Sequence, residues 1–238
     1  MNAEFEGRVV LVAGGTGGLG RSVSLAFLRE KAAVVATYHS REEFGALEQA
    51  AGAGSMLEGR PVDATDPAQV GRLIDEVVAK YGRLDVLVNA IGGYAGGIRL
   101  WEMEPKVLDQ MLLLNLRAGF VLARAAVPAM LKQGRGAILN VASQAAIDHA
   151  AGASAYAASK AAAVALMDSL AQDLRGSGVR VNSVLPSIID TEANRQAMPK
   201  ADFAKWPKPE EIARVILFLC SDDADVIHGA AVPVYGHH

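Results

Sequence analysis

The run Arg8-Val-Val-Leu-Val-Ala13 is followed directly by Gly14-Gly-Thr-Gly-Gly-Leu-Gly20. A short β-branched and aliphatic run that ends at glycine is typical of a buried parallel strand. The glycines predict a tight turn into a helix, where the backbone can approach a pyrophosphate and the helix N-terminus offers N–H groups. We therefore expect Gly14, Gly18 and Gly20 to shape a phosphate loop. The alternative is a turn that needs glycine only for steric reasons.

The rest of the chain repeats this pattern of strand followed by helix. We expect strands at 33–38, 56–62, 84–89, 137–141, 179–185 and 230–234, and helices after 20, from 40, from 66, and over 105–133, 154–175 and 209–220. This alternation predicts an α/β fold, a Rossmann-like doubly wound parallel sheet of about seven strands in the order 3-2-1-4-5-6-7 with helices on both faces. We expect one dinucleotide-binding and catalytic domain over 1–238, within which 187–206 forms a loop or substrate lid.

Composition and charge exclude several classes of protein. A net charge of −3 on 238 residues gives no electrostatic footprint for nucleic acid or an anionic membrane. Cys220 is the only cysteine, which excludes an intramolecular disulfide and a thiolate metal cluster, and its apolar neighbours predict a buried thiol. Charged residues interrupt the N-terminus and no apolar run approaches ~18 residues, so we expect no signal peptide, no membrane span and a cytoplasmic protein. We expect no metal site and assign no role to His237 and His238.

The residues Thr37-Tyr38-His39-Ser40-Arg41 end the second expected strand and bear on the choice of nicotinamide cofactor. An acidic residue there would bind the ribose hydroxyls of NAD and repel a 2′-phosphate. No carboxylate ends this strand, whereas Arg41 and the N–H groups of a helix capped by Ser40 are suited to a 2′-phosphate. We therefore expect NADP(H) in preference to NAD(H). The alternative is a solvated Arg41, with Glu42 or Glu43 reaching the ribose.

Tyr156 and Lys160 lie four residues apart in an expected helix and so share one of its faces. A phenol titrates near 10, and moving its pKa to ~7 requires about 4 kcal/mol, which one ammonium about 4 Å away supplies in order of magnitude. The spacing predicts a tyrosine that exchanges protons with a substrate oxygen, with the Ser143 hydroxyl at the end of the preceding strand. The alternative is a surface helix with an incidental pair.

In these features the chain resembles the short-chain dehydrogenase/reductase family along nearly its whole length. The family's glycine pattern runs from Ala13 to Gly20, with Ala13 in place of threonine. Its motif after the fourth strand appears in altered form as Asn89-Ala-Ile-Gly92. Its Asn-x-Val-x-Pro-Gly run appears as Asn182-Ser-Val-Leu-Pro-Ser187, with serine in place of glycine.

The resemblance implies hydride transfer between nicotinamide C4 and a carbonyl or alcohol carbon. It assigns proton transfer to Tyr156, a second hydrogen bond to the substrate oxygen to Ser143, binding of the nicotinamide ribose to Lys160, and a proton-relay water to Asn115. Alternatives are reduction of a C=N bond in a pteridine-like ring and, from another class, a dinucleotide-sensing regulator without turnover.

The expected cofactor contacts follow the carboxyl ends of the strands. Asp63 is expected to meet the adenine ring or to form a turn, and Thr191 corresponds to the threonine that often contacts the nicotinamide in this family. The full expected set is Gly14, Thr16, Gly17, Gly18, Leu19, Tyr38, His39, Ser40, Arg41, Asp63, Ala64, Asn89, Ala90, Gly92, Tyr156, Lys160, Pro186, Ile188, Ile189 and Thr191.

Two further expectations concern the substrate and the assembly. The stretches 92–97 and 185–206 resemble loops of the dihydropteridine reductases, and a small-molecule substrate is expected to meet Tyr94, His149 and Met198. The alternatives are that Tyr94 packs under the glycine loop, that His149 is a solvated loop residue, and that Met198 only anchors the lid. The second apolar face of the helix at 154–175 predicts a homodimer or homotetramer.

Overall fold

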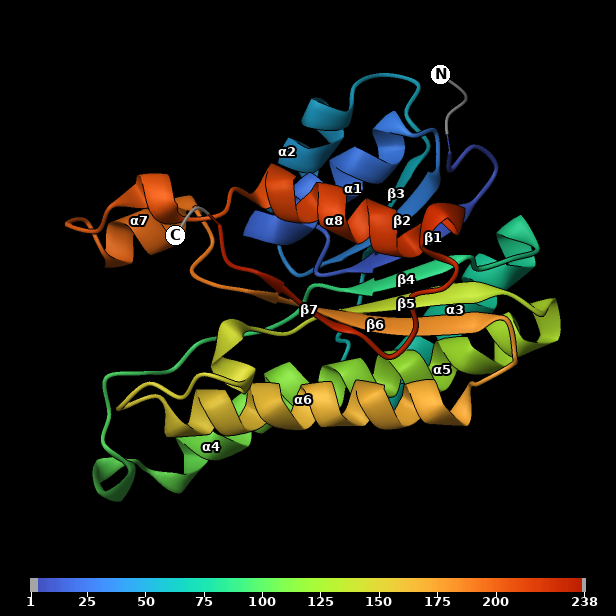
Figure 1. The fold of residues 1–238 in the computed structure, drawn as a ribbon. Helices are drawn as coiled ribbons and strands as arrows, with labels where there is room; N and C mark the ends of the chain where they lie inside the picture. Colours follow the sequence, from blue (N-terminus) through green and yellow to red (C-terminus); the bar gives the residue numbers. More distant parts are fainter. Residues whose placement is uncertain (1–3, 237–238) are drawn as a thin grey trace.

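The computed structural model describes residues 4–236, so His237 and His238 lie outside the described part. Seven parallel strands form one sheet in the predicted order β3-β2-β1-β4-β5-β6-β7 (Figure 1). The strands are β1 (Val9–Ala13), β2 (Ala33–Tyr38), β3 (Leu57–Pro61), β4 (Val86–Asn89), β5 (Gly136–Val141), β6 (Val179–Pro186) and β7 (Ala231–Val234). The predicted α/β fold class is confirmed.

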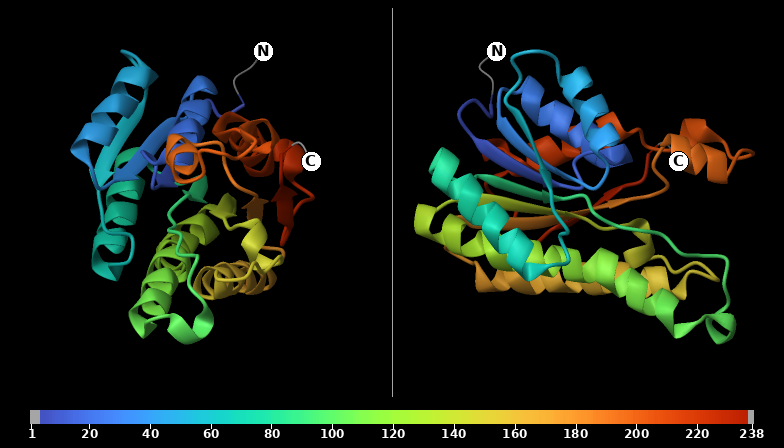
Figure 2. Two further views of the ribbon diagram at one scale, coloured as in Figure 1. Left: turned by 90° about the vertical axis from the view of Figure 1, so that its left-hand side faces the viewer. Right: turned by 180° about the vertical axis from the view of Figure 1, so that it is seen from behind.

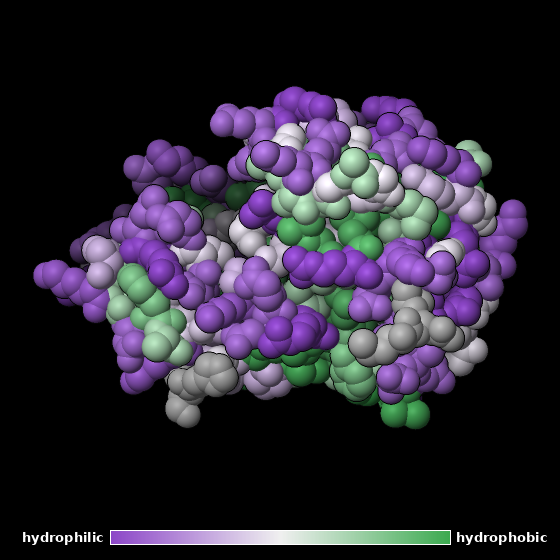
Figure 3. Space-filling model, turned by 90° about the horizontal axis from the view of Figure 1, so that it is seen from above, coloured by the Kyte–Doolittle hydropathy of each residue, from purple (hydrophilic) through white to green (hydrophobic). Residues whose placement is uncertain are grey.

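Helices cover both faces of the sheet, as Figures 1 and 2 show from three sides. One face carries α1 (Gly18–Arg29), α2 (Arg41–Ala51) and α8 (Pro209–Cys220). The other carries α3 (Pro67–Tyr81), α4 (Pro105–Leu112), α5 (Ala118–Gln133) and α6 (Ser154–Asp173). Seen from above, the face with α1, α2 and α8 is mostly hydrophilic, with hydrophobic atoms gathered in its middle (Figure 3).

The two cores follow from the alternation of side chains along β1. Val9 and Leu11 face one cluster with α3, α5 and α6, whereas Val10 and Val12 face the other with α1 and α8. All five β1 side chains are buried, as a strand covered on both faces requires. The predicted buried thiol of Cys220 lies in the second cluster, and burial raises its pKa to about 12.

Local signals set the helix starts. The Asp66 carboxylate accepts hydrogen bonds from the N–H groups of Ala68 and Gln69, with Pro67 at the first helical position, as predicted. Ser40 caps α2 by accepting from the Glu43 N–H at 3.2 Å. The Glu43 carboxylate accepts from the Thr16 hydroxyl at 3.0 Å.

Two expected segments differ in detail. The helix expected over 105–133 is continuous but contains a π-helical segment, Leu113–Arg117, between α4 and α5. The segment expected as a loop at 187–206 contains α7 (Glu192–Ala197) and a 3₁₀ turn at Phe203–Lys205. Periodicity could not reveal a six-residue helix, which starts because the Thr191 hydroxyl accepts from the Asn194 N–H.

By length and composition alone, the helix at Pro105–Gln133 could cross a membrane, which the sequence expectation did not anticipate. Its α5 part is instead a core helix of this fold, since Ala118, Leu122, Ala126 and Met130 are fully buried against the sheet.

Candidate active site

The carboxyl ends of the strands bring the expected site residues to one edge of the sheet. The phosphate loop follows β1, the 90–99 loop follows β4, Ser143 follows β5, and the segment with α7 follows β6. In Figure 1, α7 and the loop after β4 extend from the same end of the molecule. Parallel α/β sheets bind ligands at this edge.

The phosphate loop is shaped by contacts that leave no room for side chains. Gly14 has a φ of +73°, and its N–H donates to the Thr37 hydroxyl at 2.9 Å. A Cβ on Gly20 would lie 2.0 Å from the Gly14 carbonyl oxygen. Helix α1 starts after Gly17 without a side-chain cap. The loop therefore fits a pyrophosphate, because backbone N–H groups at a helix start are presented without a side chain in front of them.

The end of β2 is covered by an aromatic stack. The Tyr38 ring lies on Phe44 with centroids 4.8 Å apart, and the Arg41 guanidinium lies over the same Phe44 ring. Arg41 also pairs with Glu48 at 3.2 Å and stays mostly exposed. The nearest acidic contact to the phosphate loop is Glu43, through Thr16. Both the expected cation and the alternative carboxylate are thus present beside the loop.

The other expected cofactor contacts lie along the same edge. Asp63 forms a turn by accepting from the N–H and hydroxyl of Thr65, and these bonds lower the pKa of its carboxyl, helped by the charge of exposed His39. The Thr191 methyl lies so close to Gly18 that a Cβ there would be 2.9 Å away. The contact of Asp63 with the adenine ring stays a prediction. Thr191 lies against the phosphate loop at Gly18.

The candidate acid/base group, Tyr156, lies in α6, and its phenol lies close enough to the Ser143 side chain for that hydroxyl to influence its pKa. Burial raises the pKa of Tyr156, the Ser143 hydroxyl opposes that rise, and the nearby Tyr94 phenol adds to it. The expected lowering of this pKa by Lys160 is therefore wrong for this arrangement. The Lys160 ammonium lies 6.0 Å from the centroid of the Tyr156 ring.

Lys160 is buried, and its ammonium donates to the Val141 carbonyl at 3.1 Å. Burial lowers its pKa from 10.5 to about 8, so it remains mainly charged at neutral pH. A Cβ on Gly92 would lie 3.0 Å from the ammonium, which places the 90–99 loop directly against it. The predicted shared helix face thus brings both residues to the site, but the ammonium turns toward β5.

Asn115 is buried in the π-helical segment and holds the loop after β4. Its amide oxygen accepts from the Gly93 N–H at 2.9 Å, and its amide nitrogen donates to the Gly93 carbonyl and to the Ser159 hydroxyl. The Ser159 hydroxyl donates to the Tyr156 carbonyl. The side chain thus ties the loop to α6, and its expected part in a proton-relay water stays a prediction.

The three expected substrate residues differ in placement. Tyr94 is 70% exposed and meets the Tyr156 ring edge-to-face at 5.0 Å. His149 is exposed in the loop between Ser143 and α6, and Met198 ends α7. The structure therefore brings Tyr94 to the candidate acid/base group and leaves His149 and Met198 at the rim.

Three residues of the site escaped sequence reasoning: Thr37, Gly93 and Ser159. Thr37 had a usable signal, since a hydroxyl at the end of β2 stands next to the first glycine turn in any such sheet. Ser159 had none, because a serine in an alanine-rich helix has no pattern that marks it.

Because the pKa of Lys160 is lowered in the folded state, the unfolded chain binds more protons between pH 8 and 10.5. We expect the protein without added cofactor to gain up to about 3 kcal/mol of unfolding free energy over this range, relative to Lys160→Met. The difference is the readout, since Cys220 titrates in both proteins. Urea unfolding at a series of pH values checks it, and a difference that does not vary with pH would contradict the buried ammonium.

Comparison with known proteins identifies relatives of this chain. Residues 13–236 match the family model described as enoyl-(acyl carrier protein) reductase. The chain is 35% identical to the 3-oxoacyl-(acyl-carrier-protein) reductase FabG of Thermotoga maritima, covering 98% of both chains. It is 36% identical to D-threitol dehydrogenase of Mycolicibacterium smegmatis, over 98% of this chain and 93% of that one.

Solved structures agree with the sequence relatives. A short-chain type dehydrogenase/reductase from Mycobacterium ulcerans superposes with a TM-score of 0.92 at 26% identity, covering 98% of this chain and 90% of that one. The loop similarity to dihydropteridine reductases stays a prediction. With a family match over almost the whole chain and the sheet order and edge described above, the protein belongs to the short-chain dehydrogenase/reductase family of oxidoreductases.

Proposed function

We propose that the protein is an NADP(H)-dependent reductase of a carbonyl group, or a dehydrogenase of the corresponding alcohol. One observation carries this proposal: the Tyr156 phenol lies beside the Ser143 side chain, and the buried Lys160 ammonium lies 6.0 Å from the centroid of the Tyr156 ring. Two neighbouring hydroxyls suit an oxygen that gains charge as the carbonyl is reduced. The names of the relatives, an oxoacyl reductase and a polyol dehydrogenase, support the same bond type.

In the reductive direction, Tyr156 donates its proton to the substrate oxygen while Ser143 donates a hydrogen bond to it. The raised pKa keeps the phenol protonated at neutral pH, which suits its role as the acid. A bound nicotinamide would supply the hydride to the carbonyl carbon, and this hydride and the Tyr156 proton together would convert C=O to CH–OH. Lys160, held by the Val141 carbonyl, keeps a positive charge beside the cofactor ribose and the phenol.

The experiment is turnover of NADPH and NADH with a panel of ketones, aldehydes, oxoacyl thioesters and quinonoid pterins. We expect oxidation of NADPH with at least one carbonyl substrate. Turnover of the pterins alone would replace the proposal by C=N reduction. Tight cofactor binding with no turnover of any substrate would replace it by a sensor.

The preference for NADP(H) rests on Arg41, whose guanidinium is mostly exposed beside the Ser40-capped start of α2. We expect Arg41→Gln to raise KM for NADPH about 10- to 100-fold, because a charge-assisted hydrogen bond contributes about 1.5–3 kcal/mol. KM for NADH should change little. Exposed Arg29, at the far end of α1, provides the matched control in Arg29→Gln.

Glu43→Gln tests the same site from the opposite side. Removing this carboxylate from the phosphate loop should lower KM for NADPH below the wild-type value, since a 2′-phosphate is repelled by a nearby negative charge. A wild-type preference for NADH, or equal effects of Arg41→Gln on both cofactors, would assign NAD(H) instead.

We further propose that the chain acts as one domain, with 187–206 as the substrate lid, in a cytoplasmic homodimer or homotetramer. The C-terminal part of this segment is ordered by an internal contact, because buried Trp206 packs against Phe203 with ring centroids 5.0 Å apart. The assembly is supported by an apolar groove between α4, α5 and α6 that includes partly exposed Leu113 and Phe120. Sedimentation velocity distinguishes the oligomers from a monomer.

A further inference from the structure

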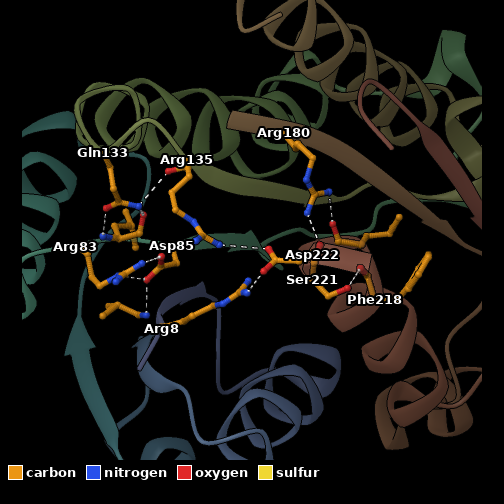
Figure 4. A network of polar contacts seen from close by, with 12 residues as sticks. Arg8, Arg83, Asp85, Gln133, Arg135, Arg180, Phe218, Ser221 and Asp222 are labelled. Atoms are coloured by element: carbon orange, nitrogen blue, oxygen red, sulfur yellow. Dashed lines mark hydrogen bonds and ion pairs between the residues drawn. The ribbon is translucent and has the colours of Figure 1, made fainter. Parts of the chain in front are cut away.

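A second charged site lies at the opposite edge of the sheet, where the strands begin. A cavity of about 420 Å³ opens there, within the range of roughly 300–1,000 Å³ that small-molecule sites occupy. Three arginines line it near the starts of three strands. They are Arg8 directly before β1, Arg135 directly before β5, and Arg180 in β6 (Figure 4). The proposed oxidoreductase function uses none of them.

The carboxylates at this edge do not balance the arginines. Asp85 lines the cavity, but it is paired with Arg83 through two hydrogen bonds and also accepts from the Val9 N–H at 2.9 Å. This leaves three guanidiniums facing two other lining carboxylates, Asp222 and Asp225.

Arg180 contributes charge without a carboxylate of its own. Its guanidinium donates to the carbonyls of Leu219 and Ser221, both at 2.7 Å, and more weakly to that of Ile227. These bonds fix its position against the C-terminal end of α8. Carbonyl partners satisfy its donors but cancel only part of its charge.

Asp222 occupies the place that an external anion would take. One oxygen accepts from Arg8 at 2.5 Å and the other from Arg135 at 3.3 Å, so a single carboxylate bridges two guanidiniums (Figure 4). The Arg135 contact is longer than a usual charge-assisted bond of about 2.7–2.9 Å. The Asp222 side chain is 69% exposed and that of Arg135 49% exposed, so both are open to solvent and to a ligand.

We propose that this cavity binds a small molecule through an oxyanion group, a carboxylate or a phosphate, which joins or displaces Asp222 between Arg8 and Arg135. The guanidiniums offer planar donor pairs of the kind that bind carboxylate and phosphate in a bidentate manner. The cavity lies at the strand starts, so a ligand here would leave the carboxyl ends of the strands free.

Isothermal titration calorimetry with inorganic phosphate at constant ionic strength tests the proposal. We expect saturable millimolar or tighter binding to the full-length protein, at least tenfold weaker in Arg135→Gln. Asp222→Asn removes the competing internal carboxylate and should tighten binding at least threefold. A network with only a structural role would not produce that gain.

Lys132→Gln provides the matched control, since this exposed lysine at the end of α5 carries the same charge but does not line the cavity. Thermal unfolding of each variant verifies folding. All four proteins share the nicotinamide loop, so the contribution of any phosphate bound there cancels when the variants are compared. The proposal is overturned if wild type shows no saturable binding, if Arg135→Gln and Lys132→Gln behave alike, or if Asp222→Asn weakens binding. None of these results depends on turnover, so they leave the proposed reductase activity untouched.

Discussion

Replacing Tyr156 with phenylalanine should lower kcat for carbonyl reduction by about 10²- to 10⁴-fold, the range that a positioned acid/base group contributes. The ring and its edge-to-face contact with Tyr94 remain, so the pocket keeps its shape. The lost hydroxyl leaves Ser143 as the only one of the two donors to the substrate oxygen. Steady-state kinetics with a substrate from the panel measures the effect.

Cofactor binding is the second readout for this variant. Quenching of protein fluorescence by NADPH should change less than threefold, because the phenol takes part in chemistry more than in affinity. Tyr81→Phe is the matched control. Tyr81 ends α3 and donates to Glu58 in β3, far from the strand ends that form the site. If Tyr156→Phe retains a tenth of wild-type kcat, the proton must come from another group.

Gly20→Ala should raise the dissociation constant for the nicotinamide cofactor at least 100-fold, equivalent to about 3 kcal/mol. The added methyl would stand 2.0 Å from the Gly14 carbonyl oxygen and 2.9 Å from its carbon, and neither is a flexible side chain. The loop must therefore move away from α1 and lose the close approach that a pyrophosphate needs. Fluorescence titration with NADPH measures the change.

Gly71→Ala separates this effect from a general cost of replacing glycine. Gly71 lies within α3 with nothing near its would-be Cβ, so alanine there should stabilise the protein by up to about 1 kcal/mol and leave cofactor binding unchanged. Circular dichroism on both variants checks the folded state. Cofactor affinity within fivefold of wild type in Gly20→Ala would show that the loop does not hold the pyrophosphate.

The sheet was accessible from the sequence because its signals are local and repeated. Each inner strand, such as β1 or β4, is a short aliphatic run buried on both faces, and a helical segment follows it. Chain order then restricts the sheet to very few arrangements. The π-helical segment and α7 were not accessible, since the first depends on how Asn115 meets the loop after β4 and the second is too short to show a period.

The sequence predicts which residues form the site but does not predict how their charges and hydrogen bonds are arranged. Spacing placed Tyr156 and Lys160 on one helix face, which the structure shares. Spacing could not show that the Val141 carbonyl draws the ammonium toward β5, or that burial dominates the pKa of the phenol. Both depend on which parts of the fold pack against α6, and helical periodicity does not predict those tertiary contacts.

The order of strands in the sheet also bears on how the chain is made. β2 and β4 join opposite sides of β1, β3 joins β2, and β5, β6 and β7 then extend the other edge in turn. No strand has to enter between two that are already paired, so the sheet can grow as the ribosome releases the chain from its N-terminus. The phosphate loop can form early in synthesis, whereas Ser143, Tyr156 and Thr191 join it only in the second half. The elements that shape the phosphate loop are therefore complete well before those that carry Ser143 and Tyr156.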